Sequence, residues 1–247
     1  MVSPSADDAE FTYSGTELDA LADAVNYYTE IVGRFAPCLR GHVVEVGAGI
    51  GTFSRFILAL PTVVKLTAIE PAANIVDVLR ARVGDDPRVE VVQGYLPDLV
   101  TSLESPVDAV IAVNVLEHVE DDAAFLHAAH DMLLPGGALL LFVPALPTLF
   151  GTLDAAFGHF RRYSKATLAE RVSNAGFQDP SLRYVNGPGT LLWLVAGRVF
   201  RRQTLDERGV RFYDRWIMPV ITRAERRWEP PLGQSILLIA RKQAMSL

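Results

Sequence analysis

The chain has 247 residues, of which half are hydrophobic and 21% are charged, and its formal net charge is −6. This composition is typical of a folded globular unit and excludes a largely disordered chain, and the overall acidity disfavours nucleic acid as a partner. Cys38 is the only cysteine, so an intrachain disulfide and a cysteine-based zinc site are both excluded.

The N-terminal segment is polar and acidic and lacks the basic and apolar regions of a signal peptide. The residues after it carry apolar side chains at helical spacing, which predicts a helix over Thr16–Gly33 with Thr16 as its N-cap. We expect residues 1–34 to form an N-terminal helical lid and residues 35–247 to form the main domain.

From residue 42 onward, short apolar runs alternate with helical stretches. This pattern predicts a parallel sheet that is buried on both faces. The tripeptide Pro135-Gly136-Gly137 is predicted to be a turn that ends one helix and precedes the next strand. The expected strands are His42–Val46, Val64–Ile69, Val89–Gln93, Asp108–Val113 and Ala138–Val143, and the expected helices are Thr52–Ala59, Ala73–Arg82 and Asp121–Leu134.

The last third of the chain is richer in predicted helices, and we expect helical insertions within residues 145–230 to form the acceptor site. The longest apolar stretch, Leu191–Ala196, is far shorter than the ~20 residues that span a bilayer, which predicts a cytoplasmic protein without stable membrane insertion. The expected elements are helices over Lys165–Ala175, Pro188–Arg202 and Arg211–Arg227 and strands over Leu182–Val185 and Ser235–Ala240.

A glycine-rich loop follows the first predicted strand in the run Val43–Phe53. Glycines allow the backbone to approach a ligand closely, and a helix N-terminus presents free N–H groups. The spacing is G-x-G-x-G, whereas a dinucleotide site needs G-x-G-x-x-G, and Thr52 occupies the last position of that fingerprint. Glu45 would also repel a pyrophosphate but would tolerate an amino acid's ammonium group. The loop therefore disfavours a nicotinamide dinucleotide.

Glu70 ends the second predicted strand, where a carboxylate can accept hydrogen bonds from both hydroxyls of a ribose. Together with the loop, it resembles the cofactor motifs of class I S-adenosylmethionine (SAM)-dependent methyltransferases, and the wider match is to the type-11/type-23 small-molecule group. Further segments that carry this resemblance are Asn26–Tyr28, Asn114–Asp121, Leu133–Gly137, Gly158–Ser164 and Gly233–Ser235.

The resemblance implies a Rossmann-like α/β fold with a seven-stranded, mostly parallel sheet in the order 3-2-1-4-5-7-6, flanked by helices. It also implies SAM as cofactor and S-adenosylhomocysteine as product. Many members carry an aspartate near the adenine, whereas this chain has Gln93-Gly94-Tyr95. The implied cofactor contacts are Glu45, Gly47 and Gly49 at the methionine part, Glu70 at the ribose, Gly94 and Tyr95 at the adenine, and Asn114 near the sulfonium. His118 is a further candidate cofactor contact, with a role as a base as the alternative, and Tyr27 could cover the cofactor or stack on an aromatic acceptor.

Three residues are candidates for acceptor chemistry: Glu117, His159 and Tyr28. Histidine can take up a proton at neutral pH, and a carboxylate or phenol can act as acid, base or hydrogen-bond partner. Each also has a structural alternative, which is loop anchoring for His159, a helix N-terminal acid for Glu117 and core packing for Tyr28. Arg161 and Arg162 are candidates for binding an acidic group or for a structural role. We predict no metal site.

The expected function is methyl transfer to a small, fairly apolar acceptor, with an electron-rich carbon such as that of an indole as the specific hypothesis. Such a carbon is nucleophilic without a strong base, and methylation of an oxygen or a nitrogen stays open. Two alternatives stay open at this point. One is a membrane-surface methyltransferase of lipid or glycolipid assembly, based on the arginines of the predicted helix Pro188–Arg202. The other is a non-catalytic partner subunit with this fold. A homodimer is a further possibility.

Overall fold

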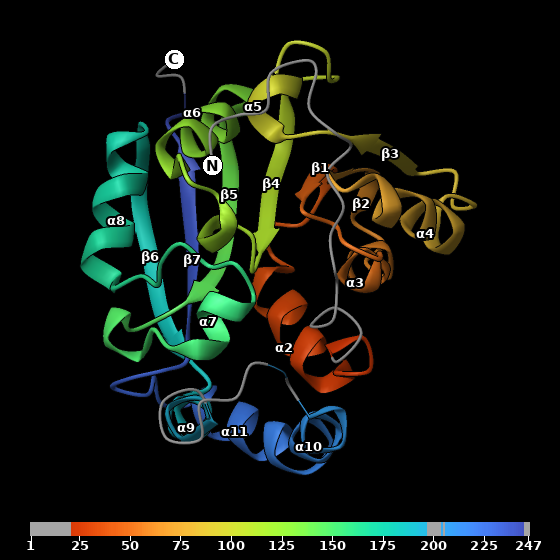
Figure 1. The fold of residues 1–247 in the computed structure, drawn as a ribbon. Coiled ribbons are helices and arrows are strands. Elements are labelled where there is room, and N and C mark those ends of the chain that lie inside the picture. Colours follow the sequence, from red (N-terminus) through yellow and green to blue (C-terminus); the bar gives the residue numbers. More distant parts are fainter. Residues whose placement is uncertain (1–20, 197–203, 205, 245–247) are drawn as a thin grey trace.

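A seven-stranded sheet in the order β3-β2-β1-β4-β5-β7-β6 runs through the computed structural model, which describes residues 21–196, 204 and 206–244 (Figure 1). Neighbouring strands are parallel, except that β7 is antiparallel to both β5 and β6. The predicted fold class and strand order are therefore confirmed. The strands are β1 (Gly41–Val46), β2 (Val63–Glu70), β3 (Val89–Gln93), β4 (Val107–Val113), β5 (Leu133–Pro144), β6 (Phe177–Val185) and β7 (Ser235–Lys242).

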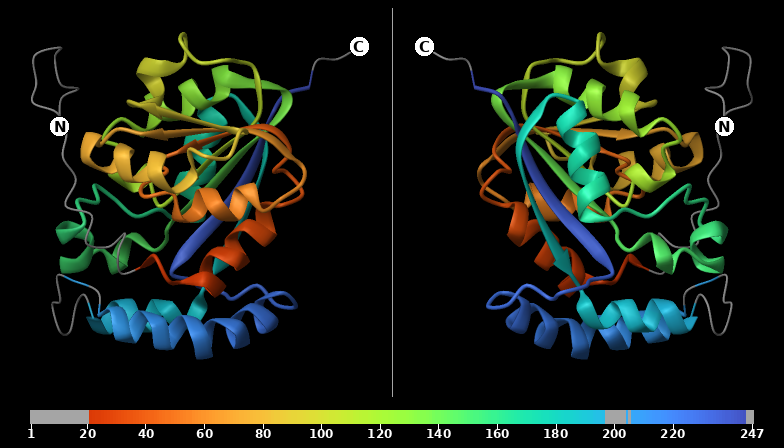
Figure 2. Two further views of the ribbon diagram at one scale, coloured as in Figure 1. Left: turned by 90° about the vertical axis from the view of Figure 1, so that its right-hand side faces the viewer. Right: turned by 90° about the vertical axis from the view of Figure 1, so that its left-hand side faces the viewer.

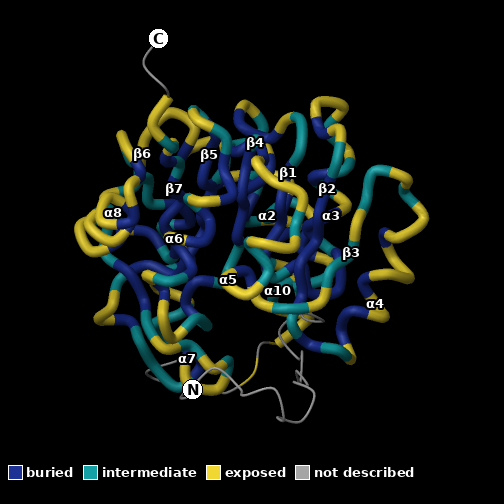
Figure 3. Tube along the Cα trace, turned by 90° about the horizontal axis from the view of Figure 1, so that it is seen from above, coloured by how far each residue is buried: buried dark blue, intermediate teal, exposed yellow. Residues whose placement is uncertain are grey.

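Helices cover both faces of this sheet, because successive strand residues point to opposite sides and both sides are apolar. Val43 packs into the cluster that holds α2 and α3, whereas Val44 packs into the cluster that holds α6 and α8. Figure 3 shows the buried strands between helices whose outer sides are exposed. The helices are α2 (Val25–Phe35), α3 (Thr52–Leu58) and α4 (Ala73–Val83) on one face, and α5 (Leu96–Leu99), α6 (Asp122–Met132) and α8 (Lys165–Asn174) on the other.

Two predicted boundaries differ from the structure. Pro135-Gly136-Gly137 is not a turn before β5 but an irregularity within it: Leu133 already pairs with Val107, and regular pairing resumes at Ala138. Gly136 has a φ of +80°, which glycine adopts without strain. Of the predicted helix Thr16–Gly33, residues 16–20 lie outside the described part of the chain, Leu21 is helical, and α2 begins at Val25 after a break in the helix.

A layer of helices lies at the carboxyl ends of the parallel strands. It consists of α9 (Gly187–Leu194), α10 (Glu207–Phe212), the π-helical segment η4 (Tyr213–Ile217) and α11 (Met218–Glu225). The last three follow one another directly as one helix, which we call helix 207–225. Figure 2 shows this layer along one end of the molecule. The predicted helix Pro188–Arg202 is confirmed only as far as α9, because residues 197–203 lie outside the described part of the chain.

Asp214 fastens helix 207–225 to the N-terminus of α2. Its Oδ2 accepts from Asn26 N at 3.0 Å, and its Oδ1 accepts from Tyr27 N at 2.8 Å. The Asn26 side chain donates in turn to the Asp214 backbone carbonyl at 3.0 Å. A negative charge is favourable at a helix N-terminus, where the first N–H groups lack partners within the helix. Asp214 therefore caps α2 although it lies 188 positions after Asn26 in the sequence.

Replacing Asp214 with alanine is expected to lower the free energy of unfolding by about 2 kcal/mol, because two buried N–H groups lose a charged acceptor. For a chain of this size, that corresponds to a decrease in Tm of roughly 4–8 °C, measurable by calorimetry. Asp77→Ala, which removes an exposed carboxylate on α4, is the matched control. If Asp214→Ala has the same Tm as the control variant, the capping role is contradicted.

Candidate active site

Glu45, near the end of β1, is a buried carboxylate at the glycine-rich loop. Its Oε2 makes no hydrogen bond among the described residues, and the Ser54 hydroxyl lies close enough to the carboxyl group to lower its pKa. Burial raises the pKa of Glu45 to about 8, with Ser54 opposing and the charge of Glu70 adding to the shift. An unpaired buried carboxylate is costly, so this oxygen is suited to a cationic ligand group.

The loop after Glu45 has the shape of a ligand cradle. Gly47 and Gly49 have φ values of +69° and +54°, a region that favours glycine. A Cβ at Gly47 would lie 2.4 Å from the Val115 side chain, so no larger residue fits there. The sequence places glycine where both the backbone angle and the space require it.

Glu70 ends β2 and reaches across to this loop. Its Oε2 accepts from Gly49 N at 2.9 Å, and its Oε1 accepts from Ala72 N at 3.0 Å. Burial raises the pKa of Glu70, and the two backbone N–H groups oppose that shift. Glu70 therefore holds the loop in place as well as presenting a carboxylate. Gly94 N donates to the Glu70 carbonyl, and burial and the charge of Glu70 raise the pKa of the half-exposed Tyr95, so both predicted adenine contacts lie beside Glu70.

Asn114 follows β4 with a φ of +54°, and its side-chain amide donates to the Tyr27 hydroxyl at 3.2 Å. Burial raises the pKa of Tyr27, while the bond from Asn114 lowers it and the charge of Glu117 raises it. Tyr28 packs with Phe53 and Phe56 in the core, and burial raises its pKa, with smaller effects of Tyr27 and Glu45. Tyr28 therefore lies at the Glu45 end of the site, and its catalytic role stays a prediction.

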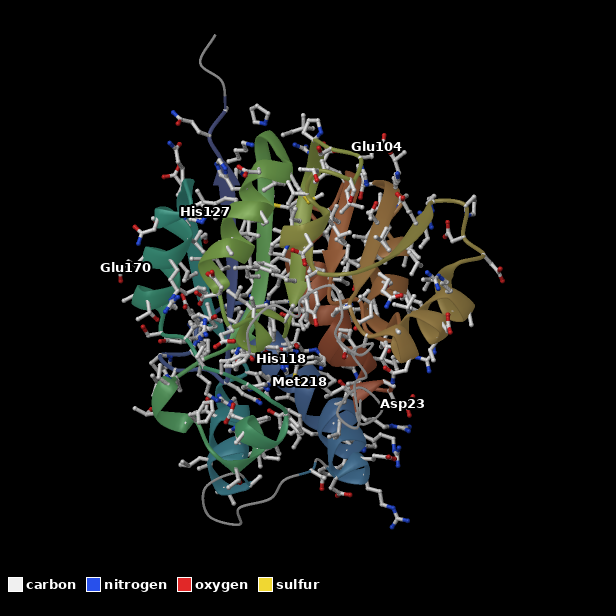
Figure 4. The ribbon with its side chains drawn as sticks, turned by 45° about the horizontal axis from the view of Figure 1, so that its top comes forward. Asp23, Glu104, His118, His127, Glu170 and Met218 are labelled. Atoms are coloured by element: carbon white, nitrogen blue, oxygen red, sulfur yellow. The ribbon has the colours of Figure 1, made fainter. Side chains whose placement is uncertain are left out.

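A second group of ionisable side chains gathers after β4. Glu117 and His118 belong to the 3₁₀ helix η1 (Leu116–His118), and His159 comes from the connection after β5. The ligand atoms of these three side chains lie within 4.8 Å of one another, and the His118 and His159 rings meet edge to face at 4.7 Å. Figure 4 shows His118 at the carboxyl edge of the sheet, with Glu104 at the opposite edge.

Burial shifts the pKa values of Glu117 and His118 in opposite directions. Burial raises the pKa of Glu117 to about 7, and the charges of His159 and Arg162 counteract this. Burial, together with His159, lowers the pKa of His118 to about 3, so its imidazole is neutral. The Glu117 Oε2 has no hydrogen-bond partner among the described residues. Glu117 therefore presents an unpaired oxygen in the same group as His159.

Asp154 contacts the His159 ring at Nδ1 and fixes its orientation. It belongs to α7 (Thr152–Ala156), and its Oδ1 lies 3.0 Å from His159 Nδ1 and accepts from Arg162 Nε at 2.6 Å. Its Oδ2 accepts from Gly151 N at 3.0 Å and from Trp193 Nε1 at 3.2 Å. Burial would raise the pKa of Asp154, but His159 and Arg162 lower it overall, so Asp154 is ionised. With Nδ1–H donated to Asp154, His159 carries its lone pair on Nε2.

The side chains of the segment Gly158–Ser164 mainly form hydrogen bonds and ion pairs with other parts of the chain. Arg161 donates to the Glu120 carbonyl at 2.7 Å and pairs with Asp122 at 2.9 Å, while the Tyr163 hydroxyl donates to the same Asp122. Arg162 is buried between Asp154, the Ala145 carbonyl and the Trp193 ring. Both arginines are thus engaged within the chain, which favours the structural alternative over binding of an acidic substrate group.

Comparison with known proteins places this site in a family. A family model described as a methyltransferase domain matches residues 20–182. The chain belongs to this methyltransferase domain family. A probable SAM-dependent methyltransferase of Mycobacterium tuberculosis is 27% identical over 244 residues, which cover 95% of this chain and 82% of that protein. The predicted enzyme class and cofactor are confirmed: the protein is a SAM-dependent methyltransferase.

Two further similarities concern more distant proteins. A ubiquinone biosynthesis O-methyltransferase of Xanthomonas axonopodis pv. citri is 32% identical over 154 residues, which cover 55% of the methyltransferase described here and 62% of that protein. A solved structure of Haemonchus contortus phosphoethanolamine N-methyltransferase 2, in complex with phosphomonomethylethanolamine and S-adenosylhomocysteine, aligns with a TM-score of 0.65 at 17% identity. That alignment covers 94% of this chain and 58% of the other, and it supports the fold alone.

The residues of the methyltransferase fit SAM through the chemistry of two carboxylates. The buried Glu45 Oε2 has no hydrogen-bond partner among the described residues, and Glu70 lies at the glycine-rich loop through its bonds from Gly49 N and Ala72 N. An amino acid's ammonium group would supply that partner, and the ribose hydroxyls would find Glu70. The individual cofactor contacts stay proposals, and they agree with this arrangement.

Cofactor binding is expected to release a proton from Glu45. Its pKa of about 8 means that most free enzyme carries a protonated Glu45 at pH 7. An ammonium group beside Oε2 favours the carboxylate, so SAM affinity should rise as the pH rises toward the Glu45 pKa of about 8. Calorimetry in buffers of different ionisation enthalpy measures the released protons. Glu45→Gln should abolish this proton release, and an unchanged release in that variant would assign the proton to another group.

Glu117, His118 and His159 are side-chain types that also bind metal ions. However, the buried Arg162 guanidinium already supplies positive charge to this group: it binds Asp154, and its charge acts on Glu117. That charge would repel a divalent cation. We therefore interpret the three residues as a proton-handling group, and the absence of a metal requirement stays a prediction.

Sequence reasoning did not single out Asp154, Trp193 or Asp214. Asp154 resembles an ordinary acid in the first turn of a short helix, and its signal lay only in its spacing from His159 and Arg162. Trp193 and Asp214 act across long sequence separations, for which a single sequence gives no signal. Among the described residues, no helix is both long and apolar enough to span a bilayer. The cytoplasmic location and the homodimer stay predictions.

Proposed function

We propose that this methyltransferase transfers the SAM methyl group to a hydroxyl oxygen of a small, largely apolar acceptor, with His159 as the proton acceptor. The observation that carries this proposal is the Asp154–His159 pair, at 3.0 Å, beside the unpaired Glu117 oxygen. A hydroxyl must lose its proton during methylation, so a positioned base accelerates the reaction. The name of the Xanthomonas relative, an O-methyltransferase, agrees with an oxygen acceptor.

The earlier hypothesis of carbon methylation rested on a site without an obvious base. The contact between Asp154 and His159 supports our proposal of His159 as such a base, which weakens the reason to prefer an indole carbon. The apolar character of the acceptor is supported by Phe157, whose ring lies 6.0 Å from that of His159. Aromatic side chains beside a few polar groups are typical of sites for small apolar molecules.

Each residue has a distinct part in the proposed reaction. SAM supplies an activated methyl group when it is bound. When the acceptor oxygen takes up that methyl group, its proton would move to His159 Nε2, and S-adenosylhomocysteine would be the product. Asp154 keeps the imidazole oriented and balances the imidazolium charge that forms. Glu117 and Tyr27 lie beside this group and are proposed to orient the acceptor and Asn114, respectively.

The test is an isotope-label screen by mass spectrometry. The purified enzyme is incubated with methyl-labelled SAM and a panel of phenols, indoles, amines and a lipid extract. We expect label on a phenolic oxygen, located by fragmentation of the product. Label on an indole carbon or an amine would overturn the oxygen assignment, and label confined to the lipid extract would support the membrane-surface alternative. Parallel reactions with EDTA test the metal prediction: lost activity that a divalent cation restores would contradict it.

A further inference from the structure

The outward side of helix 207–225 is unusually apolar for a surface. Phe212, Trp216 and Val220 are spaced four residues apart and are 60%, 62% and 63% exposed. Side chains at this spacing form one stripe along a helix. The opposite side of the helix carries the buried residues Asp214, Met218, Ile221 and Glu225. The stripe therefore faces away from the molecule and covers nothing within the described structure.

Arginines flank this stripe. Six of them are exposed in helix 207–225 and the two residues after it, although the whole chain has a net charge of −6. Asp214 and Glu225 point inward and are buried, whereas the exposed Glu207 pairs with Arg211, and Glu30 of α2 pairs with Arg226. The Arg215 guanidinium lies 5.4 Å from the centre of the Trp216 ring. The outward side is thus both apolar and cationic, with two of its arginines engaged in ion pairs, and these arginines are Arg208, Arg211, Arg215, Arg223, Arg226 and Arg227.

Neighbouring segments extend the same surface. Leu191 and Leu192 of α9 are more than half exposed, and Trp228, just after α11, is the most exposed large apolar residue described. Figure 2 shows α9 and helix 207–225 side by side in one layer at the end of the molecule. The exposed apolar side chains of this layer therefore belong to one end of the protein. We call this surface, made of Leu191, Leu192, Phe212, Trp216, Val220, Trp228 and the six arginines, the arginine–tryptophan face.

We propose that the arginine–tryptophan face binds the surface of an anionic lipid bilayer. Tryptophan and phenylalanine partition into the boundary between headgroups and acyl chains, and arginine pairs with anionic headgroups while its stem covers apolar surface. A helix with alternating aromatic and cationic residues on one side is suited to lie in that boundary. The bound enzyme would present the carboxyl edge of its sheet, which this layer covers, toward the membrane.

A second copy of the chain is a poorer occupant of the same face. A two-fold contact would bring the same six arginines of both copies together, and like charges at close range repel each other. An anionic bilayer offers negatively charged headgroups to the arginines and an apolar interior to the aromatic side chains. The charge of the face therefore selects lipid over self-association. This proposal is independent of the acceptor that the enzyme methylates.

The test is co-sedimentation of the full chain with vesicles. Binding is compared between phosphatidylcholine vesicles and vesicles that contain phosphatidylglycerol, at low salt and at about 0.5 M salt. We expect binding to the anionic vesicles that weakens tenfold or more without phosphatidylglycerol or at high salt. Absence of binding to anionic vesicles at low salt would overturn the proposal.

Paired variants separate the apolar and cationic contributions. Phe212→Ser with Trp216→Ser, and Arg215→Gln with Arg223→Gln, should each weaken vesicle binding about tenfold or more. The matched controls are Val64→Ser, which removes a 70% exposed valine from β2, and Arg40→Gln, at an exposed arginine before β1. Thermal melts and S-adenosylhomocysteine binding check that each variant is folded. Variants of the face that bind vesicles as well as the controls would refute the assignment. Loss of a dimer in ultracentrifugation, with vesicle binding unchanged, would instead identify a contact between copies.

Discussion

Replacing His159 with alanine is expected to lower kcat by about 10²–10⁴-fold, the range that a positioned general base contributes. The affinity for S-adenosylhomocysteine should stay near that of the wild type, because the predicted cofactor contacts lie at the glycine-rich loop and at Glu70. The pH profile of kcat should also lose its acidic limb in this variant. Steady-state kinetics with the acceptor found in the labelling screen, together with calorimetry, measure these quantities.

Controls distinguish proton transfer from loss of structure. His127→Ala removes an exposed histidine of α6 and should leave kcat unchanged. Asp154→Asn should lower kcat while leaving a bell-shaped or sigmoidal pH profile, because His159 is then misoriented rather than removed. A His159→Ala enzyme that keeps most of its kcat would show that the acceptor needs no base, and the carbon-methylation hypothesis would regain support.

The second large effect is expected for Glu70→Ala, which should weaken SAM binding by at least ~1.5 kcal/mol, more than tenfold in affinity. Charge-assisted hydrogen bonds to the ribose would be lost, and Gly49 N and Ala72 N would lose their acceptor as well. Glu70→Gln keeps one acceptor oxygen and should lose less. Calorimetry measures the affinities, and Glu104→Ala, at an exposed carboxylate near the opposite edge of the sheet, is the control.

A ligand analogue separates the two causes of that loss. The wild type should discriminate strongly between S-adenosylhomocysteine and its 2′,3′-dideoxy analogue, whereas Glu70→Ala should discriminate little. If the variant binds both ligands more weakly but keeps the wild-type ratio, Glu70 shapes the loop without holding the ribose. Equal affinity of the variant and the wild type for SAM would contradict the ribose role directly.

The strand order and the cofactor end of the site follow from local patterns. The buried strands are continuous apolar runs, and Glu45, the glycines and Glu70 lie within 26 residues of one another, so their roles can be inferred from spacing. The irregularity in β5 could not be inferred in this way. A proline and two glycines favour a turn locally, but pairing of Leu133 with Val107 on the neighbouring strand extends the strand past them.

The acceptor side of the site depends on tertiary contacts. The resemblance indicated Glu117 and His159 as candidates, but not the carboxylate that orients the imidazole. Asp154 receives four hydrogen bonds from three different parts of the chain, and only the last of these parts, at Trp193, is far away in sequence. The exposed stripe on helix 207–225 likewise could not be predicted from the sequence. When a helix has two apolar sides, its sequence pattern does not tell which of them faces the core.

The connection between β6 and β7 lies outside the sheet, yet its residues make contacts on which α2 and the segment around Asp154 depend. Asp214 accepts from Asn26 N and Tyr27 N at the start of α2, and the Tyr27 hydroxyl accepts in turn from Asn114. Trp193 donates to Asp154. Because of these contacts, the connection cannot be exchanged independently of the rest of the chain. A chimera that exchanges residues 186–234 with those of a relative must exchange α2 and residues 151–163 as well, since the three segments are complementary. Substrate range in such enzymes would then evolve by joint change of three distant stretches of sequence rather than by replacing one loop.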